Sequence, residues 1–132
     1  HIMKKRIEII DGCSIDIKIF EEVKKRVKKN SRVLVFLDSN HSRSHVLREL
    51  EIFSKIVSLN SFIIVCDGII KDLVDAPRSE SDWKENNPIN AIKDFTRTNK
   101  GFKVVEPKFL FNEGLIKKRV TYWPSAFIKR VK

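Results

Sequence analysis

Two aspartates follow directly on apolar runs that are typical of buried strands. Asp38 comes after residues 33–37, and Asp67 comes after residues 62–66. Because ligands of open α/β sheets bind at the carboxyl ends of the strands, both carboxylates are expected to face the same crevice. Two carboxylates with neighbouring oxygen donors suit a hard divalent cation such as Mg²⁺. The spacing therefore indicates a metal site at Asp38 and Asp67.

The residues after Asp38 add further chemistry. Residues 39–41 supply a hydroxyl, an amide and an imidazole within one turn. An imidazole in this position can act as a general base, so Asp38 and His41 are the candidate catalytic residues. An equally weighted alternative is structural: Asp38 and Asn40 cap the following helix, and Asp67 merely opens a turn. Spacing alone does not choose between these two interpretations.

The rest of the chain predicts the sheet that positions these residues. Strand-like runs alternate with helical patterns, which favours one α/β domain with a mostly parallel sheet and right-handed crossovers. The two continuously apolar runs are typical of strands covered on both faces. A C-terminal antiparallel hairpin is expected to complete the sheet. The expected strands are 6–10, 33–37, 62–66, 102–111 and 115–128, and the expected helices are 16–29, 42–57 and 88–98.

Composition limits the class of protein. The chain has 132 residues, with 27 Lys and Arg against 17 Asp and Glu, and 42% of its residues are hydrophobic. This excludes a disordered polyelectrolyte, and no apolar run reaches the roughly 20 residues of a membrane helix. The two distant cysteines fit neither a disulfide framework nor a zinc site and indicate a reducing, cytoplasmic setting. Residues 1–3 are interpreted as a cloning remnant with the start Met, which leaves 4–132 as a single domain.

The formal net charge of +10 allows a second class of function. Basic clusters such as 24–26 and 117–119 are typical of solvated helix faces. They would also suit a non-catalytic basic α/β module that binds an acidic partner or nucleic acid. Specific nucleic-acid binding is not expected, since no aromatic-interleaved single-strand motif accompanies the clusters.

The polar segment 68–88, which contains Trp83, has the length of a lid or binding loop.

An ordered series of motifs resembles the cephalosporin hydroxylase / rhamnosyl O-methyltransferase family. The most specific is Leu-Asp-Ser-Asn-His-Ser at residues 37–42, followed by His-Val-Leu-Arg-Glu-Leu at 45–50. Together the matches cover the chain from about residue 5 to residue 119. The further matches lie at residues 9–14, 62–68, 86–88, 91–92, 108–110, 112 and 114.

The resemblance implies a Rossmann-like fold that uses S-adenosylmethionine (SAM), and Mg²⁺-dependent O-methyl transfer to a hydroxylated small molecule or glycolipid sugar. By this similarity Asp38 and Asp67 are metal ligands. The loop of Gly12, Cys13 and Ser14 is expected beside the adenine. The family often has an acidic residue where this chain has Cys66, so weaker Mg²⁺ binding is expected.

The four glycines, at positions 12, 68, 101 and 114, form no glycine-rich phosphate or dinucleotide loop. In the family such a loop, and a strand with a ribose-binding acid, precede the run at residues 7–10. The chain is therefore expected to be the C-terminal part of a methyltransferase domain, inactive or incomplete by itself, with negligible SAM affinity. The strand at 33–37 would then have an open edge, which either the strand at 7–10 or a second copy fills. A homo-oligomer, most simply a two-fold dimer, is expected.

Overall fold

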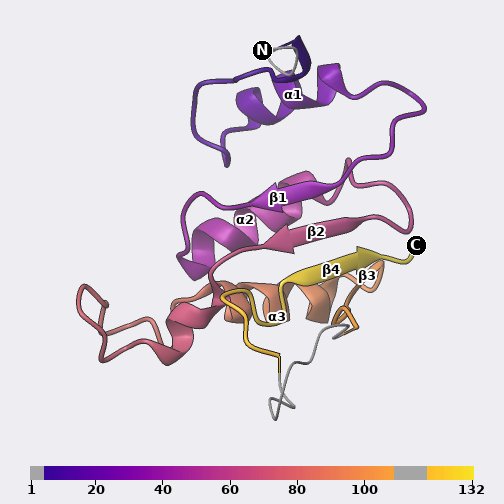
Figure 1. Cartoon of the computed structure of the whole chain (residues 1–132). Helices are drawn as coiled ribbons and strands as arrows, with labels where there is room; N and C mark the ends of the chain where they lie inside the picture. Colours follow the sequence, from indigo (N-terminus) through magenta and orange to yellow (C-terminus); the bar gives the residue numbers. More distant parts are fainter. Residues whose placement is uncertain (1–4, 109–118) are drawn as a thin grey trace.

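The computed structural model describes residues 5–108 and 119–132 of the chain. Within these ranges one four-stranded sheet has the strand order β1-β2-β4-β3 (Figure 1). The strands are β1 (Val35–Leu37), β2 (Phe62–Val65), β3 (Phe102–Val104) and β4 (Phe127–Arg130). The helices are α1 (Ile17–Arg26), α2 (Arg43–Phe53), α3 (Pro88–Thr98) and the 3-10 helix η2 (Gly68–Asp72).

The direction of β4 decides the type of sheet. β1 and β2 pair in parallel, whereas β4 runs antiparallel to both of its neighbours, β2 and β3. Three strands therefore point one way and β4 alone points the other. The expectation of a mostly parallel sheet is wrong, because the returning chain inserts β4 between β2 and β3. The α/β class is as predicted.

The predicted C-terminal hairpin is present in part. β3 and β4 pair antiparallel, with Phe102 opposite Arg130. Both strands are shorter than predicted, since residues 105–108 and 119–126 lie outside them. The expected turn at 112–114 falls outside the described residues.

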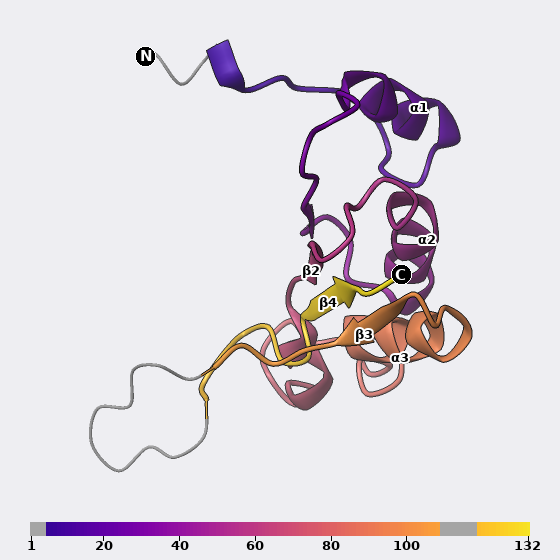
Figure 2. The same ribbon diagram turned by 90° about the vertical axis from the view of Figure 1, so that its right-hand side faces the viewer.

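The helices cover one face of the sheet. Figure 2 shows α2 and α3 on the same side of the strands, where their apolar faces form the core with inward residues of β1, β2 and β4. On the other face Leu34 is 52% and Phe36 is 47% exposed. The expectation that both faces are covered is therefore wrong for the described residues. The members of this core that are at most 2% exposed are Val46, Leu50, Val57, Ile63, Val65, Ala91, Ile92, Phe95 and Ile128.

The N-terminal segment also departs from the prediction. Residues 7–10 form no strand, and Ile9 is 90% exposed. Among the described residues β1 consequently has no partner along its outer edge. α1 instead packs on α2 through an edge-on contact between Phe20 and Phe53, with ring centroids 5.6 Å apart. A strand-like pattern alone does not make a strand, because its N–H and C=O groups need a neighbour.

The helices lie where the sequence places them. α3 has its predicted bounds, since Asn87 accepts a hydrogen bond from the N–H of Asn90 and Pro88 occupies the first turn. α2 ends at Phe53, four residues before the predicted end at Val57. The apolar pattern continues past the helix because Val57 still belongs to the core.

Candidate metal and acceptor site

Asp38, His41 and Asp67 meet at the carboxyl ends of β1 and β2. One side-chain ligand atom from each lies within 4.8 Å of the other two. His41 Nε2 is 3.6 Å from Asp38 Oδ1 and 3.6 Å from Asp67 Oδ2. This nitrogen is buried and has no hydrogen-bond partner among the described residues. The structure thus brings together the three residues that strand ends and spacing singled out.

The pairing of β1 with β2 explains this convergence. Leu37 lies opposite Val65, and the N–H of Cys66 donates to the carbonyl of Leu37 at 3.0 Å. Both aspartates therefore leave the sheet at the same edge. Asp67 has a left-handed backbone, with φ of 54°. Such a conformation costs about 1–2 kcal/mol for a residue with a Cβ, and strain of this kind is concentrated at functional sites.

The structure also bears on the capping alternative. The N-cap of α2 is Ser42, whose side chain makes no cap hydrogen bond. Asn40 Oδ1 accepts from the N–H of Ser42 at 2.8 Å, and Asn86 Oδ1 accepts from the N–H of Arg43 at 2.7 Å. Asn40 thus has the structural role of that alternative. Among the described residues Asp38 contributes no cap, which leaves its carboxylate available.

Cys66 is a neighbour of the site without being a ligand. Its side chain is fully buried. Burial, followed by the nearby carboxylates of Asp38 and Asp67, raises the pKa of its thiol to about 12. A thiol with that pKa stays protonated at neutral pH, so it is not a nucleophile there.

A cavity of about 850 Å³ opens from this cluster. This volume lies within the range of small-molecule sites. One wall is the loop 39–42 between β1 and α2, which includes His41, and Asp67 also lines the cavity. Another wall comes from the segment that the sequence marked as a lid or binding loop and includes Glu80, Asp82 and Trp83. The site therefore has a cation-binding end and room for a second molecule.

The loop expected beside the adenine does not line this cavity, although Ser14 Oγ lies 3.5 Å from Oγ of the lining residue Ser39. A Cβ on Gly12, which has φ of 147°, would clash with Ile19 Cδ1, so this glycine serves local packing. Cys13 is exposed. Ser14 Oγ lies 3.1 Å from His45 Nε2. Neither Gly12, Cys13 nor Ser14 belongs to the lining of the cavity.

Sequence reasoning missed the polar cluster that Ser14 joins. Glu49 is only 2% exposed, and its Oε1 accepts from Ser39 Oγ at 2.8 Å. Its other oxygen has no hydrogen-bond partner among the described residues. His45 Nε2 lies 3.6 Å from Glu49 Oε1 and 3.4 Å from Ser39 Oγ. The available signal was the spacing of His45 and Glu49, which puts both on one face of a helix.

Comparison with protein families decides the relationship of this chain to known proteins. The model described as Rhamnosyl O-methyltransferase/CmcI matches residues 1–131. The chain belongs to this family. Its membership confirms the resemblance carried by residues 37–42, and the mixed α/β sheet is consistent with a methyltransferase-like fold.

Other comparisons add no relative. Neither the comparison with curated proteins nor the one with solved structures gives a match. In the described part of this Rhamnosyl O-methyltransferase/CmcI family member, no helix combines the length and the apolar character needed to cross a membrane.

Proposed function

We propose that this chain supplies the metal and acceptor side of a Mg²⁺-dependent, SAM-dependent O-methyltransferase. Family membership supports O-methyl transfer as the reaction class. The single observation that carries the residue assignment is the convergence of Asp38, His41 and Asp67 at one end of the cavity. The acceptor class follows from the family description, which favours a hydroxylated small molecule or a sugar.

The donor atoms fit a divalent cation. Asp38 and Asp67 offer carboxylate oxygens, which are the preferred ligands of Mg²⁺. Both carboxylates are partly exposed, which leaves room for the waters that Mg²⁺ retains. When bound there, Mg²⁺ would act as a Lewis acid that polarises an acceptor hydroxyl and lowers its pKa.

His41 is the proposed general base. Its Nε2 is buried, accepts no hydrogen bond from the described residues and belongs to a residue of the cavity wall. The acceptor O–H bond breaks, the proton moves to Nε2, and the acceptor oxygen becomes the nucleophile for methyl transfer. Asp38 and Asp67 each have an oxygen 3.6 Å from Nε2, so the proposed base lies directly beside the proposed metal ligands.

The residues that would contact SAM fit the group less well. Gly12 is needed for the approach of Ile19 and offers no open cradle. Cys13 and Ser14 remain the proposed contacts of this loop with the cofactor. We expect the affinity of this chain for SAM to be weaker than micromolar. Calorimetric titration with SAM measures this affinity. Micromolar affinity would contradict this expectation.

Metal binding tests the residue assignment. In ¹⁵N-labelled chain, Mn²⁺ should broaden the amide signals of Ser39 and Gly68, and excess Mg²⁺ should restore them. Asp38→Asn and Asp67→Asn should each weaken binding by about tenfold or more, since each removes a charged ligand. Asp72→Asn is the matched control, because Asp72 is an exposed acid in the neighbouring η2.

The His41→Gln variant separates the roles of the three residues. As a general base, His41 can be replaced without loss of Mg²⁺ affinity. Unchanged Mn²⁺ broadening in both aspartate variants would contradict the metal site. A loss of metal affinity in His41→Gln would instead make His41 a ligand and remove it as the base.

A further inference from the structure

The cavity wall has a charge opposite to that of the chain. The chain has a formal net charge of +10, yet no lysine or arginine is among the described residues that line the cavity. Its ionisable lining consists of Asp67, Glu80 and Asp82 beside His41, with Asp38 in contact with His41. The acidic side chains of this lining would repel an anionic acceptor.

The acids fall into two groups with different partners. Asp38 and Asp67 converge on His41, and together they match the charge of one divalent cation. Glu80 and Asp82 come from the other wall and do not belong to that cluster. Two negative charges consequently remain in the cavity after the proposed metal site is filled.

Asp82 is held in place by bonds that leave one oxygen open. Its carbonyl accepts from the N–H groups of Glu85 and Asn86 at 2.9 and 2.7 Å. Its Oδ2 accepts from Asn86 Nδ2 at 2.8 Å, and the other oxygen accepts no hydrogen bond from the described residues. Asn86 is in turn fixed by the N–H of Arg43. This carboxylate therefore belongs to an ordered wall.

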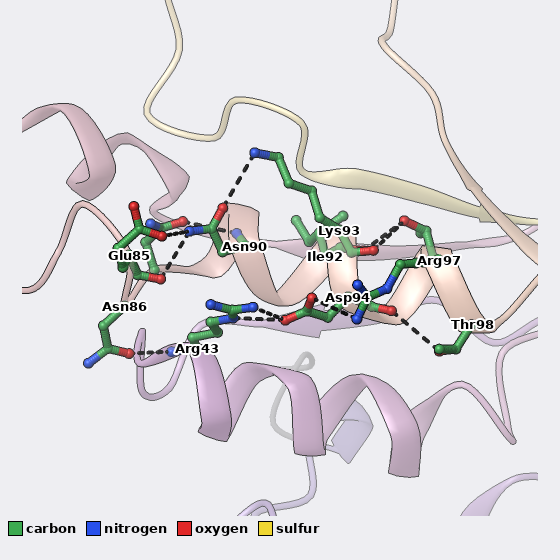
Figure 3. A network of polar contacts seen from close by, with 11 residues as sticks. Arg43, Glu85, Asn86, Asn90, Ile92, Lys93, Asp94, Arg97 and Thr98 are labelled. Carbon is green, nitrogen blue, oxygen red and sulfur yellow. Dashed lines mark hydrogen bonds and ion pairs between the residues drawn. The ribbon is translucent and has the colours of Figure 1, made fainter.

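The side chain of Arg43 does not neutralise this wall. Figure 3 shows the Arg43 side chain directed at Asp94 of α3, while Asn86 meets the Arg43 backbone. The guanidinium donates to Asp94 Oδ2 through Nε at 2.7 Å and lies 2.6 Å from it through Nη2. Such a two-nitrogen pair commits the guanidinium to Asp94. The negative charge of the wall stays available to a ligand.

An aromatic ring follows the two acids in sequence. Trp83 follows Asp82 directly, is half-buried and lines the same cavity. An indole face attracts an ammonium group and also stacks on the apolar face of a sugar ring. Two carboxylates and an indole form a recognised environment for an organic cation.

We propose that the acceptor carries a protonated amine as well as the hydroxyl that is methylated, as an amino sugar or amino alcohol does. This inference rests on the proposed function, because the Asp38–His41–Asp67 end of the cavity would hold the metal and the hydroxyl. Glu80, Asp82 and Trp83 would bind the ammonium group at the other end. They act as specificity residues and take no part in proton or methyl transfer.

Three matched monosaccharides test the charge preference. Glucosamine, glucose and glucuronate present an ammonium, a neutral and a carboxylate group on similar rings. Each is titrated into ¹⁵N-labelled chain with Mg²⁺ at about pH 6.5, where an amine is protonated. The readout is the indole N–H signal of Trp83. This signal is assigned with the Trp123→Phe variant, which lacks the other indole of the chain. Glucosamine should bind about fivefold or more tightly than glucose, and glucuronate should bind most weakly.

Variants that remove the charge of Glu80 and Asp82 test whether these two residues cause the preference for glucosamine. Asp82→Asn keeps an oxygen that can accept from Asn86, so the wall should stay folded. Glu80→Gln and Asp82→Asn together should reduce the glucosamine-to-glucose ratio to about one, whereas Asp75→Asn, on the same segment but outside the lining, should not. Added salt should lower the ratio in the unchanged chain.

The outcomes separate this inference from the proposed function. Equal binding of the three sugars, no binding of glucosamine, or a preference for glucuronate overturns the amine assignment, while Mn²⁺ broadening at Ser39 would still support the metal site. Glucosamine preference without any metal binding would retain the amine assignment and overturn the metal site.

Discussion

The side chain of Asn86 accepts a hydrogen bond from the backbone N–H of Arg43, at 2.7 Å and across 43 positions of sequence. It supplies the cap that Ser42 does not provide and ties the wall of the cavity to the start of α2. Asn86→Ala should lower the free energy of unfolding by about 1 kcal/mol, as loss of a cap does. Urea denaturation measures the change. Asn30→Ala, an exposed asparagine without a side-chain hydrogen bond among the described residues, should have almost no effect.

The buried carboxylate of Glu49 depends on Ser39. Ser39→Ala removes the 2.8 Å hydrogen bond to Oε1 and leaves both oxygens without a donor at hydrogen-bonding distance among the described residues. The free energy of unfolding should fall by about 1–3 kcal/mol, the range for an unsatisfied buried polar group. Ser44→Ala on the exposed side of α2 is the control. Equal effects of the two variants in thermal unfolding would argue against this role of Ser39.

Cys66 offers a way to strengthen the proposed metal site. Cys66→Asp should tighten Mg²⁺ binding, because it adds a hard oxygen donor next to Asp67. Without Mg²⁺ the variant should be less stable, since position 66 is fully buried. The measurement is the rise of Tm with added Mg²⁺, which should exceed that of the unchanged chain and of Cys13→Asp. An equal rise in all three would place the metal elsewhere.

The two cysteines should differ in reactivity. Iodoacetamide should modify the exposed Cys13 in the folded chain and spare Cys66, as mass spectrometry would show. Folding raises the pKa of the Cys66 thiol from 9.0 to about 12. Its contribution to stability is therefore complete below about pH 9 and is lost as the pH rises toward 12. Cys66→Ala should flatten the decline of unfolding free energy over that window, and Cys13→Ala should not.

The outer edge of β1 and the uncovered face beside it predict self-association. Leu34, Phe62 and Phe127 are among the apolar residues that line a second cavity of about 340 Å³ on this face. An unpaired edge next to apolar surface favours pairing with a second copy. Light scattering at micromolar concentration should give the mass of a dimer, and Leu34→Lys should give a monomer. Leu59→Lys, at a similarly exposed leucine, should remain dimeric; a monomeric unchanged chain would refute the prediction.

Local signals predicted α3 and the carboxyl ends of β1 and β2 well. α3 was predictable to the residue because Asn87 and Pro88 act within its own first turn. Asp38 and Asp67 were predictable as neighbours because each ends a continuously apolar run, and parallel pairing then places both at one edge.

Features that depend on distant partners were not predictable. Nothing within β4 shows that it lies between β2 and β3, since pairing is decided by the whole sheet. Residues 7–10 have a strand pattern but no neighbouring strand among the described residues. The role of Asp82 was hidden because residues 68–88 lack a regular apolar period, which is the main signal for placing a segment.

The central position of β4 has a consequence for synthesis. β2 pairs on one side with β1, which is synthesised before it. Its other edge stays unpaired until β4 has been synthesised, and 61 residues lie between Val65 and Phe127. At about 5–20 residues per second, this corresponds to roughly 3–12 s of translation. During that time the apolar edge of β2 is open to other chains. We therefore expect ribosome-associated chaperones to matter more for this protein than for one whose strands pair in the order of their synthesis.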